Sequence, residues 1–217
     1  AVVAGDIADP ELPQKLIDTS LKKFGRCDVV FNGAGVMHTG SVEEADVDTL
    51  CQMVRVNCEA ASRVSYTAVK HFKKMGSGTL INVSSILGTK VRPNAGVYAG
   101  TKYAIEALSE ALRMELAKTD IRVTVIEPGL VTTELQDHFA VHPREALGIT
   151  KPLVPADVAR CVRFILEQPA GRTADVELSS WSRQHDFLRT PLARLARACG
   201  VFRAGNLSRR LSGRQED

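Results

Sequence analysis

Apolar and polar positions follow two patterns along this chain, one typical of buried strands and one typical of amphipathic helices. Four short apolar runs predict strands, at residues 28–31, 78–83, 121–126 and 175–178. Apolar residues recur at helical spacing in four longer segments, at residues 12–24, 46–75, 96–118 and 155–167. This alternation predicts an α/β fold built on a parallel sheet, because parallel strands need helical crossovers.

The chain also opens on an apolar stretch. Residues 1–6 predict a further short strand, and Asp9-Pro10 after it is a turn signal. The sequence Ser41-Val42-Glu43-Glu44 matches a capping box ahead of the helix at residues 46–75.

Tyr98 and Lys102 introduce candidate chemistry. They stand four residues apart near the start of the helix at residues 96–118, so both side chains leave the same helix face. An isolated phenol titrates near ~10, and a neighbouring cation favours the phenolate, so Tyr98 could act as an acid or a base. Pairs with this spacing are also common on solvated helix faces, and the spacing alone does not exclude a simple surface pair.

The motifs around this pair resemble those of the short-chain dehydrogenase/reductase family. In chain order they are the turn Asn32-Gly33-Ala34-Gly35, the helical Asn57, Ser85 with Tyr98 and Lys102, and the loop from Pro128-Gly129 to Val131 and Thr133. The resemblance covers residues 2–178. It implies a Rossmann-like doubly wound parallel sheet and hydride transfer between NAD or NADP and a secondary alcohol or carbonyl compound.

The resemblance assigns catalytic roles to Asn57, Ser85, Tyr98 and Lys102. Ser85 is favoured over Ser84 because the family's serine precedes its tyrosine by thirteen residues. By this resemblance Tyr98 exchanges the substrate proton, Ser85 binds the substrate oxygen, and Lys102 lowers the pKa of Tyr98 and holds the nicotinamide ribose. Asn57 connects Lys102 to solvent through water, and it is equally readable as a structural amide between a helix and a strand.

The resemblance also places a set of residues at the cofactor: Asp6, Asn32, Gly33, Ala34, Gly35, Tyr98, Lys102, Pro128, Gly129, Val131 and Thr133. Residues 134–148 follow as a candidate substrate lid. Its histidines, His138 and His142, read as polar lid residues rather than metal ligands, because no cysteine or acid stands at ligand spacing.

One family feature has no counterpart in the sequence. No G-x-x-x-G-x-G stretch occurs in the 217 residues, although such a turn ordinarily holds the cofactor pyrophosphate. We therefore expect a sheet truncated at its N-terminal side, either as a piece of a longer chain or with residues 1–6 paired directly beside residues 28–31. The chain is then an oxidoreductase or, alternatively, a catalytically impaired relative that acts as a binding module.

Composition adds few constraints. The 217 residues, 44% hydrophobic with a net charge of +3, fit one domain at residues 1–180 and do not indicate nucleic-acid binding. Residues 181–217 hold eight arginines against three acids and predict a basic, partly disordered extension; packing on protein is favoured over attachment to a membrane surface. Five scattered cysteines and the absence of a signal peptide favour the cytoplasm. The family resemblance also implies a homo-oligomer.

Overall fold

A parallel sheet of four strands, in the order β1-β2-β3-β5, forms the centre of the computed structural model, which describes residues 1–169, 175–179 and 181–182. The strands are β1 (Val29–Asn32), β2 (Ser77–Val83), β3 (Asp120–Pro128) and β5 (Val176–Leu178). All four predicted strands are confirmed to within two residues at each end. The short strands β4 (Ile149–Lys151) and β6 (Trp181–Ser182) form a separate antiparallel pair.

The helices also follow the predicted segments. They are α1 (Leu12–Phe24), α2 (Val47–Val54), α3 (Ala61–Met75), α4 (Gly96–Glu115), α5 (Pro143–Ala146) and α6 (Pro155–Glu167). Single turns occur at η2 (Ile86–Gly88) and η3 (Glu134–Gln136). The helix predicted over residues 46–75 is continuous from α2 to α3, and the π-helical turn η1 (Arg55–Ala60) joins the two α-helical parts.

The start of α2 corrects one prediction. The Asp46 carboxylate accepts hydrogen bonds from the backbone N–H groups of Asp48 and Thr49, both at 3.3 Å, and is the N-cap. The Ser41 hydroxyl instead donates to the Glu44 carboxylate at 3.1 Å within the preceding turn. The apparent capping box therefore closes a turn and does not start the helix.

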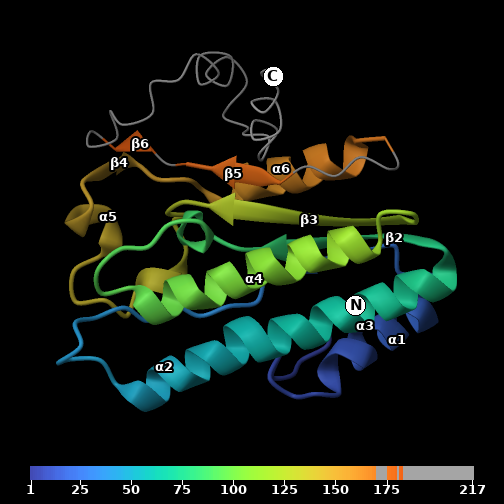
Figure 1. Cartoon of the computed structure of the whole chain (residues 1–217), viewed down its shortest axis with the longest axis horizontal. Helices are drawn as coiled ribbons and strands as arrows, with labels where there is room; N and C mark the ends of the chain where they lie inside the picture. Colours follow the sequence, from blue (N-terminus) through green and yellow to red (C-terminus); the bar gives the residue numbers. More distant parts are fainter. Residues whose placement is uncertain (170–174, 180, 183–217) are drawn as a thin grey trace, which may run out of the picture.

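The sheet lies between helices on its two faces (Figure 1). Successive residues of a strand point to opposite faces, so Leu80 packs with Phe72 of α3 and Leu112 of α4, while Ile81 packs with Cys161 and its neighbours on α6. Helices α3 and α4 thus cover one face, and α6 covers the other face over β3. The buried parallel strands β2 and β3 occupy the middle of this arrangement.

The N-terminal side of the sheet differs from the prediction. Residues 1–6 form no strand, and Val2 is 97% exposed. Strand β1 pairs with β2 and with no other described strand, so residues 1–6 do not pair beside it. A strand forms only where a partner offers aligned N–H and C=O groups, and these residues have none. Val29 and Phe31 of β1 remain 39% and 47% exposed.

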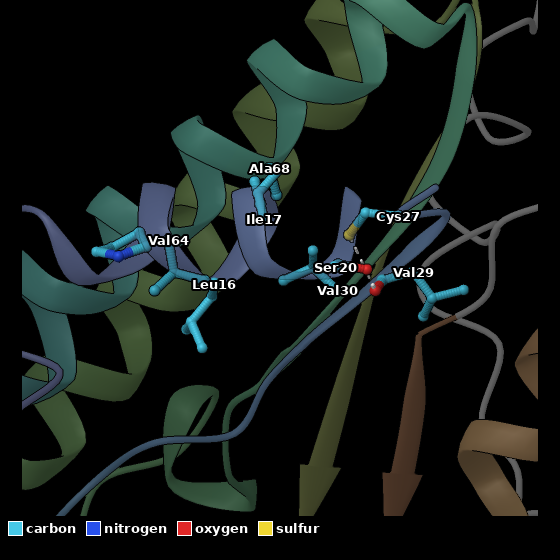
Figure 2. Close-up of a pocket in the computed structure, with 9 residues that line it drawn as sticks. Leu16, Ile17, Ser20, Cys27, Val29, Val30, Val64 and Ala68 are labelled. Carbon is cyan, nitrogen blue, oxygen red and sulfur yellow. Dashed lines mark hydrogen bonds between the residues drawn. The ribbon is translucent and has the colours of Figure 1, made fainter. Parts of the chain in front are cut away.

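A shallow groove follows this edge, between α1, β1 and α3. Figure 2 shows the side chains that line it, among them Leu16 and Ile17 of α1, Val30 of β1 and Val64 of α3. Its volume is about 240 Å³ and its lining is mainly apolar.

The remaining predictions at the C-terminal end fall largely outside the described residues. Of the proposed basic extension at residues 181–217, the structure describes only the backbone of Trp181–Ser182. Across the described part of the chain, no helix is both long enough and apolar enough to cross a lipid bilayer.

Candidate active site

Ser85, Tyr98 and Lys102 converge at the C-terminal end of β2. Ser85 is the second residue after this strand, and the other two lie on the first turns of α4. The Lys102 ammonium donates to the Val83 carbonyl at 3.0 Å and lies 5.8 Å from the centre of the Tyr98 ring. The three residues are only 8%, 7% and 7% exposed, so the predicted pair is a buried cluster and not a solvated surface pair.

Ser85 is held by the backbone on both sides. Its Oγ accepts a hydrogen bond from Leu87 N–H at 3.2 Å, as the N-cap of η2, and donates to the Pro128 carbonyl at 3.4 Å. The hydroxyl also hydrogen-bonds with the Tyr98 phenol. Two of the predicted motifs, the serine strand end and the Pro128 loop, therefore meet at this side chain.

Asn57 lies on the π-helical turn and is almost completely buried. Its Oδ1 accepts from Val36 N–H at 2.9 Å, and its Nδ2 donates to the Val36 carbonyl at 2.8 Å and to Thr101 Oγ1 at 3.2 Å. The amide thus fixes the chain after the Asn32–Gly35 turn against α4. This is a structural role, but its partners are a loop and a helix, and not the strand that the sequence had suggested. π-Helical turns are frequent at functional sites.

Gly35 lies against the same group. A Cβ at this position would be 3.3 Å from Asn57 Oδ1 and 3.8 Å from Lys102 Nζ. The first distance is tighter than an ordinary contact, so glycine lets the backbone pass close to both side chains.

Burial controls the protonation of Tyr98 and Lys102. It raises the pKa of Tyr98, against the opposing effects of the Ser85 hydroxyl and the Arg92 charge. Burial also lowers the pKa of Lys102 to about 8, although Cys58 and Glu106 act in the opposite direction. The sequence predicted that Lys102 would depress the pKa of Tyr98, and this is wrong for the structure, because the cost of burying a phenolate exceeds the stabilisation available.

The residues assigned to the cofactor separate into distinct environments. Asn32 is buried, and its Nδ2 donates to the Ala61 carbonyl at 3.1 Å and to Asn82 Oδ1 at 3.0 Å, which ties β1 to its neighbours. Gly33 and Ala34 are exposed beyond the strand end. Asp6 accepts from Ala8 N–H at 2.9 Å in an exposed turn, and no described contact joins it to the Tyr98 cluster.

The loop from Pro128 to Thr133 is tied down by its backbone. Gly129 N–H donates to the Leu178 carbonyl at 2.6 Å, and Val131 forms a parallel bridge with Leu153. Thr133 Oγ1 accepts from Leu135 N–H at 3.4 Å and caps η3. The loop therefore runs from the end of β3, beside Ser85, into the candidate lid.

The candidate lid packs directly on the Tyr98 cluster. Leu135 and Phe139 contact a buried group that includes Met37 and Tyr98. The His138 ring centre lies 4.8 Å from that of His38, on the loop after Gly35. His142 Nδ1 accepts from Arg144 N–H at 3.1 Å and caps α5. Among the described residues, no group of three or more histidine, cysteine or acidic side chains could hold a metal ion.

Two charged residues near the site were not singled out from the sequence. Arg92 lies between Ser85 and Tyr98 and acts electrostatically on the phenol. Glu127 precedes Pro128 and is buried, and burial together with Glu106, Glu177 and Asp175 raises its pKa to about 7. Glu127 could have been noticed in the sequence, because it is an acid that directly follows the largely apolar run at residues 121–126. No sequence pattern pointed to Arg92, because it lies in a loop and its position depends on the three-dimensional fold.

Comparison with known proteins gives a consistent result. Residues 1–142 match the family described as short chain dehydrogenase. An uncharacterized oxidoreductase of Staphylococcus saprophyticus is 34% identical over 169 residues, which cover 76% of this chain and 69% of the relative. One of Staphylococcus aureus is 34% identical over 168 residues, 77% of this chain and 70% of the relative.

Solved structures share the fold. ElxO with NADP bound has a TM-score of 0.70 at 26% identity, covering 82% of this chain and 76% of that protein. The 3-ketoacyl-(acyl-carrier-protein) reductase from Brucella melitensis complexed with NADH has a TM-score of 0.70 at 28% identity, covering 81% and 76%. The match over most of the chain, together with the buried serine, tyrosine and lysine, shows that this protein belongs to the short-chain dehydrogenase family of NAD(P)-dependent oxidoreductases.

Proposed function

We propose that this chain transfers hydride reversibly between NAD or NADP and a secondary alcohol or the corresponding carbonyl compound. The observation that carries the proposal is the convergence of the Ser85 hydroxyl, the Tyr98 phenol and the Lys102 ammonium in one buried cluster at a strand end. Ligands of open α/β sheets bind at the carboxyl ends of the strands, which is where this cluster lies.

The residues present fit the nicotinamide end of such a cofactor. The Gly35 backbone passes beside Asn57 and Lys102 without a Cβ in the way, and Lys102 can reach ribose hydroxyls from that side. The Pro128–Thr133 loop adds backbone groups at the end of β3. When bound, the nicotinamide supplies or accepts the hydride. The 217 residues contain no glycine-rich turn for the pyrophosphate, so we expect weak cofactor binding by this chain alone.

The protonation states favour a division of roles. Because the pKa of Tyr98 is raised, the phenol is protonated at neutral pH and can donate its proton to a carbonyl oxygen during reduction. Ser85, which already hydrogen-bonds with that phenol, would donate to the same oxygen and orient it. Lys102, with a pKa of about 8, is mostly protonated at neutral pH. Lys102 Nζ and Asn57 Oδ1 both lie close to Gly35, which supports the predicted role of Asn57 in connecting Lys102 to solvent.

Substitution of the phenol tests the proposal. Tyr98→Phe removes the transferable proton, and we expect turnover to fall by roughly 10²- to 10⁴-fold with unchanged nicotinamide affinity. Oxidation of NADPH and NADH would be followed at 340 nm with a panel of ketones. Tyr103→Phe is the matched control, because Tyr103 lies on the same helix and is exposed. Equal turnover in the Tyr98 variant and the parent would refute the assignment.

A second candidate function is that of a non-catalytic interaction module. The open edge of β1 and the apolar groove beside it favour this alternative, because such edges pair readily with other chains. Thermal shift with NADH and NADPH separates the two. Saturable stabilisation by either nucleotide supports the enzyme, whereas a cooperatively folded chain that responds to neither supports the module.

Assembly and location complete the proposal. Tyr66 of α3 and Tyr103 and Met114 of α4 are exposed apolar side chains, and the family resemblance implies a homo-oligomer. A homo-oligomer through this face would bury them, and light scattering of purified protein measures the oligomeric state.

We also propose a cytoplasmic protein that acts on small molecules and does not bind nucleic acid. Mobility-shift assays with DNA and RNA would test the absence of nucleic-acid binding.

A further inference from the structure

Arg92 occupies the short connection between the two groups that would contact the reacting carbonyl. The connection runs from η2, which Ser85 caps, to the first turn of α4, which carries Tyr98. Its backbone is fixed, because Ala95 N–H bonds to the Arg92 carbonyl at 3.4 Å and Gly40 N–H bonds to the Asn94 carbonyl at 2.9 Å. The second bond joins this connection to the loop that carries His38, and Ala95 of the same connection packs in the cluster around Tyr98.

The side chain of Arg92 is half-buried but has no partner in the described part of the chain. Its guanidinium makes no hydrogen bond or ion pair there, and its charge acts on the Tyr98 phenol. The other half-buried arginines of the described residues are paired. Arg113 bonds to Asp175 at 2.9 Å, and Arg122 bonds to Thr79 and to two backbone carbonyls.

An unpaired, half-buried guanidinium beside a reaction centre favours an anionic ligand. Removing five N–H donors from water without replacement is unfavourable, and a bound carboxylate would satisfy two of them at once through bidentate hydrogen bonds. The apolar side chains that pack around Tyr98, among them Leu135 and Phe139 of the lid, would exclude water and strengthen that pairing.

We propose that Arg92 receives a carboxylate of the substrate, so that the chain acts on hydroxy acids and keto acids in preference to neutral alcohols and ketones. This inference rests on the proposed function for the reaction itself. Arg92 is the specificity-determining residue, and Ser85 and Tyr98 hold the carbonyl oxygen. A substrate carboxylate fits better than a cofactor phosphate, because Arg92 stands on the connection from η2 to α4 and its charge acts on the Tyr98 phenol, whereas it is not part of the Asn32–Gly35 turn.

The test uses the full chain and a series of probes. Pyruvate, acetoacetate and levulinate carry the carboxylate at increasing distance from the carbonyl, and their methyl esters are neutral controls. Binding at pH 7.5 is followed by the ¹³Cζ resonance of Tyr98, assigned with Tyr98→Phe and measured without cofactor. We expect at least one acid to bind about 10-fold more tightly than its ester, and Arg92→Met to remove that preference.

Two further variants control for charge and folding. Arg163→Met removes one positive charge from an exposed site on α6 and should keep the preference. Arg92→Lys keeps the charge without the planar fork and should retain part of it. Equal affinity for acids and esters in the parent, or an unchanged preference in a folded Arg92→Met variant, would overturn the proposal.

The outcome for Arg92 is separable from that for catalysis. Acid binding that depends on Arg92, without reduction by NADPH or NADH, would support the anion site and contradict the proposed reaction. Reduction of esters as fast as acids, unaffected by Arg92→Met, would support the reaction and contradict the anion site.

Discussion

The two sides of the sheet differ in how completely they are built. On one side, β2 and β3 lie between packed helices, with Leu80, Val125 and Ile126 fully buried, and the Tyr98 cluster sits at their ends. On the other side, β1 pairs with no described strand except β2, and Val29 and Phe31 are exposed. The proton-transfer part of the site therefore depends on contacts within residues 32–139. The geometry of the Tyr98 cluster does not require a strand at residues 1–6.

Matched phenylalanine substitutions should expose this difference most strongly. Phe72 of α3 is fully buried against Gly78, so Phe72→Ala should cost about 3–5 kcal/mol of the free energy of unfolding. Phe31→Ala, on the open edge, should change it by about 0.5 kcal/mol or less. Urea denaturation measures both. Similar losses at the two positions would show that the β1 edge is covered in solution.

Glu127 should make the well-packed side sensitive to pH. It pairs in register with Glu177 on β5, and its folded pKa of about 7 exceeds the usual 4.5. The folded state therefore holds a proton that the unfolded state has lost between these values, and stability should fall as pH rises from about 4.5 to 7. The loss is at most about 3 kcal/mol.

Glu127→Gln isolates this effect. The variant should show a flatter dependence of the melting temperature on pH over that range, with its gain over the parent greatest above pH 7. Glu134→Gln, at an exposed position of η3, is the control. A parent whose stability rises steadily from pH 4.5 to 7 would contradict the prediction.

Asn32 connects the two sides. Asn32→Ala removes the donor to the Ala61 carbonyl and to Asn82 Oδ1, and should cost about 1–3 kcal/mol in urea denaturation. Hydrogen exchange should show the loss of protection first in β1 and only weakly in β3. Uniform loss across the sheet would mean that β1 is not a separable edge.

The smallest effect is expected at the lid. Burial and the neighbouring His138 lower the pKa of His38, while Asp46 opposes this. The folded state thus resists protonation, and the contact between the two rings should weaken as pH falls through and below about 6.5. Limited proteolysis of residues 134–148 should become about two- to threefold faster at pH 5.5 than at pH 7.5. His138→Phe should reduce this acceleration. The same ratio of the two proteolysis rates in the variant and the parent would contradict a role for the contact between His38 and His138.

The sequence was most informative where local pattern determines structure. Apolar periodicity located β2, β3 and the long helices, and the family resemblance brought Ser85, Tyr98 and Lys102 together before their geometry was known. It failed at residues 1–6, because an apolar run becomes a strand only beside a partner. It also missed the direction of the Tyr98 pKa, which burial decides. The effect of Arg92 on Tyr98 and the contact of His38 with His138 were missed as well, because they arise between segments that meet only in three dimensions.

The π-helical turn at Arg55–Ala60 restricts how the length of this chain can change over evolution. A π turn holds one residue more than an α turn, and that residue sets the rotation of Asn57 relative to everything after it on α3. Deleting a single residue here would restore a regular helix but turn the amide by roughly 100°, away from Val36 and Thr101. Insertions and deletions should therefore be found in the surface loops of related proteins and be rare in the helix formed by α2, η1 and α3.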